Sequence, residues 1–362
     1  MRLESLQVLN VRRLQDARLE ATAETNLIWG PNGSGKTSIL EAIHLLGTGR
    51  SFRSHKAGEV ITHGAASLVV AGTVREAPNS ALRSLGIEKT SSTTRIRADG
   101  EPLKSASQLA DALPVLTLTA DSYHLLDGGP AIRRALLDRT LFHVEHAYLE
   151  KLKRAYRALQ QRNELLRKGE FSRIEIWNAQ FVVHAEEMDQ IRRGATDRLN
   201  RLLAEFSASN DLPEVALDYR RGWKAGMSLA ELLEQHSVRD REMGFTGDGP
   251  HRAEVRISCA GRPAAQVVSR GQGKLVLAVL LAAHAELIAE KSGRRPVLLV
   301  DDLAAELDRT SVRKALSTLL GTRCQTFLTT IEPEVFANAI DASTKVFHVE
   351  QGKIRSSQAA LA

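Results

Sequence analysis

The chain has 362 residues, of which 43% are hydrophobic and 25% charged; this composition excludes wholesale disorder and allows two or three domains. Lysine and arginine (49) exceed aspartate and glutamate (43), and the net charge of +6 favours a polyanionic partner. The two cysteines are far apart and in no metal-binding spacing, which argues against a disulfide framework or zinc module and favours a reducing compartment.

No segment approaches the roughly 20 apolar residues that cross a bilayer, and the N-terminus lacks an apolar signal-peptide core. The longest purely apolar run covers 275–283 and is ended by a histidine. We therefore expect a soluble cytoplasmic protein with no membrane partner.

Two short strands predicted within residues 3–19 are followed by an apolar strand at 25–29, a glycine-rich loop at 30–37 and a helix at 38–46. The loop matches the phosphate-binding pattern GxxxxGK[ST] in the strand–loop–helix context that this pattern requires. Its glycines let backbone N–H groups wrap a phosphate chain at a helix N-terminus. The predicted ATP-binding residues are Gly30, Pro31, Asn32, Gly33, Ser34, Gly35, Lys36 and Thr37. Lys36 would reach the β- and γ-phosphates as a catalytic residue, and Thr37 would ligate Mg²⁺.

The segment at 49–56 is a basic loop with one aromatic residue. Arg50, Arg53 and Lys56 are candidates for contact with nucleic-acid phosphates, and an ordinary solvated loop is an equally good interpretation. From 66 to 98, short alternating segments predict antiparallel hairpins beside the phosphate-loop sheet.

Between residues 121 and 242, apolar residues recur at spacings of three and four. They predict two long helices joined by a turn at 167–170 and packed as an antiparallel hairpin. His184 lies on the second apolar stripe, which favours a buried or boundary histidine over a ligand. Basic residues are concentrated within 150–173, and Lys151, Lys153 and Arg154 are candidates for DNA or RNA contact; a solubilising surface explains them equally well.

In the last third, alternation at 253–258 predicts a strand, and Ser269, Arg270, Gly271 and Gln272 open an apolar helix whose N-terminus could bind an anion. The run at 297–300, ending in Asp301 and Asp302, predicts a buried parallel strand with two carboxylates at its C-terminal edge. Asp301 would hold Mg²⁺ through water, and Asp302 would orient or deprotonate the attacking water as a catalytic residue.

Thr37 and Asp301 must meet on one metal ion although most of the chain separates them. The simplest account is one α/β ATPase head made from both chain ends, with the helical arm inserted between them. We expect head segments at 1–120 (phosphate loop and antiparallel β) and 246–362, and an inserted helical arm domain at 121–245.

Together these motifs resemble the ATP-binding-cassette heads of SMC-type proteins and, among them, the RecF family of bacterial recombination mediators. The resemblance runs essentially end to end. It rests on the phosphate loop and on segments 45–53, 128–138, 249–252 (Gly-Pro-His-Arg), 269–272 (Ser-Arg-Gly-Gln), 301–302 and 306–308.

The resemblance implies a homodimer in which each ATP lies between one phosphate loop and the other protomer's signature. Ser269, Arg270, Gly271 and Gln272 would then contact the γ-phosphate in trans. It further implies a weak ATPase that binds gapped, single-stranded or duplex DNA when ATP is bound. Such a protein would act with RecR and RecO to place RecA on gapped DNA, in DNA replication, repair, recombination and the SOS response.

The sequence departs from transport cassettes at four points. Arg270 replaces a glycine of the signature, and Asp302 stands where those proteins have glutamate, which suggests slow hydrolysis suited to a switch. Thr329 or Thr330 occupies the position of the switch histidine, and no counterpart of the metal-contacting glutamine is found within 115–123.

Two other function classes use the same nucleotide motifs. An energising subunit of a membrane transporter shares this head, but it is normally shorter and lacks a basic helical arm between the two halves. A small-molecule kinase shares the phosphate loop, but the segment at 269–272 would have no function in it.

Overall fold

The computed structural model describes residues 1–356 except 22, 55, 78, 211, 213 and 337–342, and the chain divides into two compact units. The head unit consists of Met1–Tyr123 with Val268–Ala362, and the arm unit consists of His124–Val267. The sequence placed residues 246–267 with the head. They belong to the arm unit because strand β10 (Glu254–Cys259) pairs antiparallel with β9 (Val215–Arg220) of the arm.

The head unit is built from strands and helices of both of its chain segments. Its first segment contains β1 (Arg2–Val11), β2 (Leu14–Glu20), β3 (Thr25–Trp29), α1 (Lys36–Thr48), α2 (Ala57–Val60), β4 (Ser67–Arg75), β5 (Leu82–Thr90), β6 (Thr94–Ala98), β7 (Glu101–Pro102), α3 (Ala106–Ala112), β8 (Val115–Leu118) and η1 (Ala120–Tyr123). Its second segment contains α11 (Arg270–Ser292), β12 (Val297–Val300), α12 (Arg309–Gly321), β13 (Thr326–Thr330), η4 (Pro333–Phe336), β14 (Lys345–Glu350) and β15 (Lys353–Ser356).

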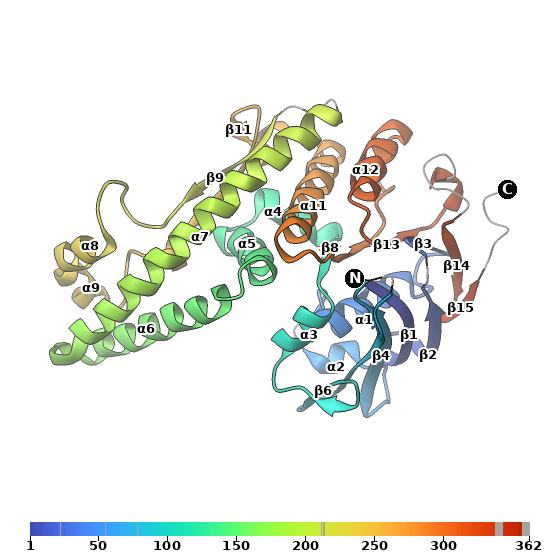
Figure 1. The fold of residues 1–362 in the computed structure, drawn as a ribbon, viewed down its shortest axis with the longest axis horizontal. Helices are drawn as coiled ribbons and strands as arrows, with labels where there is room; N and C mark the ends of the chain where they lie inside the picture. Colours follow the sequence, from blue (N-terminus) through green and yellow to red (C-terminus); the bar gives the residue numbers. More distant parts are fainter. Residues whose placement is uncertain are drawn as a thin grey trace. The chain divides into compact units, whose positions relative to one another are not determined.

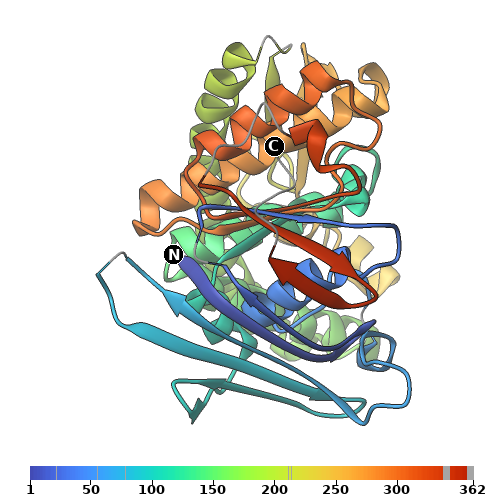
Figure 2. The ribbon, with the colours of Figure 1, turned by 90° about the vertical axis from the view of Figure 1, so that its right-hand side faces the viewer.

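These strands form two sheets of different character. The antiparallel sheet has the order β2-β1-β4-β5-β6-β7, drawn in blue and cyan in Figure 2. The second sheet has the order β15-β14-β3-β13-β12-β8, and all of its strands except β15 run parallel to their neighbours. β4 alternates between buried and half-buried residues because one face of its sheet meets the core, whereas β12 is buried throughout, as parallel strands usually are. The α/β head with an antiparallel β subdomain is confirmed.

Two helices of the head are largely buried. Helix α1 contacts strands of both sheets and is buried around nearly its whole circumference. Helix α11 is long and apolar enough to cross a membrane by composition, but 78% of its most apolar window is buried inside the structure. Its apolar residues therefore serve the core of the head.

The arm unit is mainly helical. It contains α4 (His124–Asp127), α5 (Pro130–Val144), α6 (Tyr148–Lys168), η2 (Phe171–Arg173), α7 (Ile174–Ser209), β9, α8 (Leu229–Gln235), α9 (Ser237–Met243), η3 (Pro250–Arg252), β10, β11 (Arg262–Pro263) and α10 (Ala264–Val267). Figure 1 shows α6 and α7 lying side by side as the predicted hairpin. The turn between them begins at Gly169, which adopts a left-handed φ of 71° and ends α6.

The first predicted helix of the hairpin is in fact two helices. The chain leaves helical geometry at Glu145, whose φ of −128° and ψ of 105° are extended, and α6 begins three residues later. Apolar spacing continued across this break, so the pattern alone did not reveal it. His184 has a side chain that is only 12% exposed and lies 3.3 Å from Glu187, a boundary position as expected.

A buried arginine joins the helices of the arm unit. Arg192 of α7 donates to both carboxylate oxygens of Asp138 on α5 at 3.0 and 2.9 Å. It also donates to the Tyr148 hydroxyl on α6 at 3.0 Å and to the Pro250 carbonyl at 3.0 Å. Its side chain is 1% exposed. Burial raises the pKa of Tyr148, so this hydroxyl keeps its proton and donates to Asp138.

We expect Arg192→Met to lower the free energy of unfolding of the arm unit by about 3–5 kcal/mol, because Asp138 would lose both hydrogen bonds from the guanidinium and keep only that from the Tyr148 hydroxyl in a largely buried site. Urea unfolding followed by circular dichroism measures this loss. Arg201→Met, on the exposed face of the same helix, is the matched control and should change stability by less than about 0.5 kcal/mol. Equal stabilities of the two variants would contradict the assigned role of Arg192.

Candidate functional site

The phosphate loop connects the end of β3 to the start of α1 in the middle of the parallel strands. Gly35 precedes α1 with a left-handed φ of 118°, a conformation that glycine adopts without strain. Gly30 approaches the backbone of β14 so closely that a Cβ there would lie 2.2 Å from the Val349 carbonyl oxygen. A residue with a side chain would be strained at Gly35 and would clash with the backbone at Gly30.

Two polar side chains of the loop are directed into it. Lys36 donates to the carbonyls of Gly30 at 2.7 Å and Pro31 at 3.0 Å. Burial lowers the pKa of Lys36, and the charges of Asp302 and Asp301 oppose that shift. The Ser34 hydroxyl is buried and has no hydrogen-bond partner within the described residues. A phosphate oxygen would satisfy this donor, so the loop fits a phosphorylated ligand.

The structure brings Thr37 and Asp301 together at the carboxyl edge of the parallel sheet. The Thr37 hydroxyl donates to both carboxylate oxygens of Asp301 at 3.0 Å. They meet because β3 and β12 are the two neighbours of β13, so the segments that follow them emerge on either side of one strand. A hydroxyl and a carboxylate are oxygen donors of the kind that Mg²⁺ prefers, and these residues fit that ion.

Thr329, near the end of β13, holds the acidic pair in place. Its hydroxyl donates to Asp301 at 2.6 Å and accepts from the backbone N–H of Asp302 at 2.9 Å. Thr330 instead donates to the carbonyl of Glu332 at 3.1 Å. Of the two residues that the sequence left open at the switch position, Thr329 therefore contacts the Asp301 carboxylate and the Asp302 backbone. These two hydrogen bonds hold the acidic pair in position.

The loop after Asp301 is fixed in an unusual backbone conformation. Asp302 and Glu306 both have left-handed φ values, 49° and 67°, which are uncommon for residues with a side chain. Lys274 of α11 donates to the carbonyls of Asp302, at 3.3 Å, and Ala305. Sequence analysis missed Lys274, because a lysine just inside a helix carries no local signal of a contact with a loop far along the chain.

The segment at 269–272 forms an exposed helix start. Ser269 is the N-cap of α11: its hydroxyl accepts from Gln272 N at 3.2 Å, and the Gln272 side chain accepts from Ser269 N at 2.9 Å. Arg270 has a side chain that is 80% exposed and lies 3.7 Å from Glu306. The unpaired N–H groups of this first turn face solvent and are open to an anion.

The basic loop at 49–56 is organised by Glu41, a fully buried carboxylate of α1. Glu41 accepts from Arg12 at 3.0 Å through both oxygens and from the Ser51 hydroxyl, and Arg53 lies 3.7 Å away. Lys56 lies 3.6 Å from Glu59. His55 of this loop is outside the described residues. The loop is thus held against α1, and two of its three candidate cations have carboxylate partners.

The basic residues of the arm are also partly neutralised. Lys151 on α6 pairs with Glu187 on α7 at 2.9 Å, and Lys153 pairs with Glu150 at 3.2 Å. Arg154 is exposed. The hairpin surface consequently carries less free positive charge than its lysines and arginines suggested.

Comparisons with known proteins agree with this geometry. Residues 2–355 match the family described as the RecF/RecN/SMC N terminal domain. The chain is 40% identical to the DNA replication and repair protein RecF of Stutzerimonas stutzeri over 98% of this chain and 97% of that protein. It is 38% identical to RecF of Shewanella baltica, over 98% of this chain and 99% of that protein.

Solved structures show the same fold. A structure of the recombination mediator protein RecF with ATP in the RecFOR pathway superimposes with a TM-score of 0.86, at 24% identity over 98% of this chain and 97% of that one. An Smc head bound to the C-winged helix domain of ScpA has a TM-score of 0.58 at 16% identity, over 99% of this chain and 98% of that one.

Proposed function

Because the chain belongs to the RecF family of SMC-type ATPases, we propose that it is an ATP-dependent DNA-binding protein of replication and recombinational repair. In this proposal two copies close on gapped, single-stranded or duplex DNA when ATP is bound, and slow hydrolysis opens them. The DNA-bound dimer acts in the cytoplasm with RecR and RecO to load RecA on gapped DNA and so supports the SOS response. The names of the curated relatives and the RecFOR pathway of the solved relative support this assignment.

The observation that carries the proposal is the contact of Thr37 with Asp301, at 3.0 Å, beside a phosphate loop. A helix N-terminus and a buried lysine suit a triphosphate, and the Thr37–Asp301 pair suits Mg²⁺, which would neutralise charge on the β- and γ-phosphates. Gly30 to Thr37 would therefore hold ATP. Asp302 follows Asp301, the carboxylate proposed to hold Mg²⁺, and would orient or deprotonate the attacking water.

The exposed start of α11 supports closure of two copies. Ser269, Gly271 and Gln272 present a helix N-terminus to solvent, and Arg270 adds a positive charge. A second helix N-terminus on the far side of the triphosphate would neutralise it better than one alone. Dimer closure would then depend on the γ-phosphate, and hydrolysis would remove the group that joins the two copies.

DNA contact is proposed through the phosphate backbone, by the sequence candidates Arg50, Arg53, Lys56, Lys151, Lys153 and Arg154. Among these, Arg50 and Arg154 are exposed and have no ion pair within the described residues, and they are the better candidates. Backbone contacts imply binding that is nearly independent of base sequence and weakens steeply with salt.

Sedimentation velocity and DNA titration test the proposal together. With Mg-ATP we expect a shift from monomer to dimer and tighter binding of gapped, single-stranded and duplex oligonucleotides than with ADP or no nucleotide. The DNA affinity should fall by at least about tenfold between 50 and 200 mM salt if several phosphates are contacted. A protein that stays monomeric in saturating Mg-ATP and binds DNA equally in all nucleotide states would contradict the proposal.

A further inference from the structure

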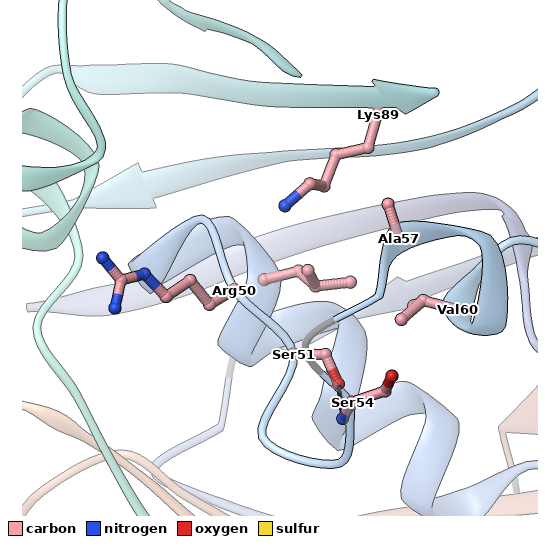
Figure 3. A pocket seen from close by; sticks show the side chains of 7 residues that line it. Arg50, Ser51, Ser54, Ala57, Val60 and Lys89 are labelled. Atoms are coloured by element: carbon pink, nitrogen blue, oxygen red, sulfur yellow. Dashed lines mark hydrogen bonds between the residues drawn. The ribbon is translucent and has the colours of Figure 1, made fainter. Parts of the chain in front are cut away.

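A cavity of about 230 Å³ lies in the head unit beside the carboxyl end of α1. It is lined by the cations Arg50 and Lys89, by Ser51 and Ser54 and by apolar side chains. In Figure 3, Lys89 reaches from β5 toward the end of α1, whereas Arg50 extends away from the two serines. Lys89 therefore directs its ammonium into the region of the cavity, and Arg50 borders the cavity with its guanidinium directed away from the serines.

The hydroxyls of the two serines already donate hydrogen bonds to carboxylates. The Ser51 hydroxyl donates to Glu41, and the Ser54 hydroxyl donates to Glu59 at 2.6 Å. Among the lining residues, the side-chain donors that remain for a ligand are thus those of the two cations.

Neither cation is neutralised inside the protein. Within the described part of the chain, no carboxylate lies within ion-pair distance of Arg50 or Lys89, whereas the neighbouring Arg53 and Lys56 have Glu41 and Glu59. Glu88 precedes Lys89 on β5 and therefore points to the opposite face of the sheet, where it lies 3.5 Å from Arg95.

The ammonium of Lys89 is only partly satisfied. It donates to the Gly49 carbonyl at 2.8 Å, which leaves two of its three N–H donors for another acceptor. Burial lowers the pKa of Lys89, and the nearby charge of Arg50 lowers it further. An anion placed between the two groups would relieve both effects.

We propose that Arg50 and Lys89 form a binding site for one phosphate group of the DNA backbone. The site deepens the proposed function and rests on it. A half-buried lysine and an exposed arginine suit a phosphodiester that approaches from solvent. Such contacts do not distinguish one base from another.

A nucleotide phosphate is the other source of the same chemistry, and position argues against it. The phosphate loop lies at the amino end of α1, and the cavity lies at its carboxyl end. A helix of 13 residues separates them by about 20 Å. The triphosphate held by Gly30 to Thr37 therefore cannot supply this phosphate to the same chain.

The test compares DNA and ATP affinities of the full chain and two double variants, Arg50→Gln/Lys89→Gln and Arg83→Gln/Arg95→Gln. The second pair removes two charges that are paired with Asp99 and Glu88. The cavity variant should bind DNA about tenfold more weakly and show a salt slope smaller by about one, with ATP affinity unchanged. The control should bind DNA within about twofold of the wild type. Arg50→Lys/Lys89→Arg, which keeps both charges, should retain most of the affinity.

Equal DNA affinities of the cavity variant and the control would overturn the site. A loss confined to ATP affinity would also overturn it, because the anion would then be a nucleotide phosphate. Matching thermal unfolding curves for all variants exclude misfolding as the cause of a loss. A wild type that binds no DNA would refute the proposed function itself. If instead the wild type and the cavity variant bind DNA equally, only the site is refuted.

Discussion

Replacement of Ser269 by arginine is expected to leave ATP binding by the single copy intact and to weaken the ATP-induced dimer by at least roughly 100-fold. Ser269 is exposed, and its hydroxyl accepts only from Gln272 N within the described residues. A long side chain there would fill the space where the other copy's triphosphate must approach, and it would remove the cap of α11. Sedimentation velocity with Mg-ATP measures the dimer, and fluorescence of a labelled nucleotide measures binding.

The matched control is Ser228→Arg in the arm unit. Ser228 forms the same kind of capping box, with Glu231, at the start of α8. The cap lost is equivalent in both variants and is worth about 1 kcal/mol, so only the position differs. Dimers that persist in Ser269→Arg would refute assembly across the signature. Loss of dimers in both variants would point to general instability.

Lys36→Met should lower ATP affinity by at least about 100-fold, since it removes the buried positive charge proposed to contact the β- and γ-phosphates. Methionine keeps most of the unbranched apolar stem of lysine, so the loop should remain folded although the Gly30 and Pro31 carbonyls lose a donor. Isothermal titration with Mg-ATP measures the effect. ATP-dependent dimerisation should be lost together with ATP binding.

Lys345→Met serves as the control for this variant. Lys345 also donates to a backbone carbonyl, that of Glu20 at 2.9 Å, but it lies on β14 away from the phosphate loop residues. Its ATP affinity should equal that of the wild type. An unchanged affinity in Lys36→Met would show that this lysine serves only to close the loop on itself.

Much of the head could be predicted because its signals are local. The phosphate loop is a contiguous pattern between a strand and a helix, and Asp301 and Asp302 end a short buried strand, so both elements are visible in a few residues of sequence. That Thr37 and Asp301 lie close together was predicted because both were expected to bind one metal ion. The strand order β3, β13, β12 explains how the sheet brings them together. The family resemblance added the expectation of a dimer, which no local pattern contains, and it favoured DNA contact for the basic segments that a solvated surface explained equally well.

The parts that sequence missed depend on pairs of distant residues. Nothing beside Glu41 in the sequence indicates that it is buried among Arg12, Ser51 and Arg53. The hairpin surface looked strongly basic because the contact of Lys151 with Glu187 joins two helices and is invisible along one of them. For the same reason Lys89, on a strand after the basic loop, was not counted with Arg50.

The contact of Lys274 with the loop at 302–305 has a consequence for the proposed dimer. In that dimer, Asp302, proposed to prepare water at its own nucleotide, would be hydrogen-bonded to the helix whose start is proposed to contact the nucleotide of the other copy. We expect a movement of either segment to shift the other, because the carbonyls of Asp302 and Ala305 accept hydrogen bonds from Lys274 of the helix that begins at 270. The two nucleotides of such a pair would not be consumed as independent events: the first cleavage would alter the chemistry of the second.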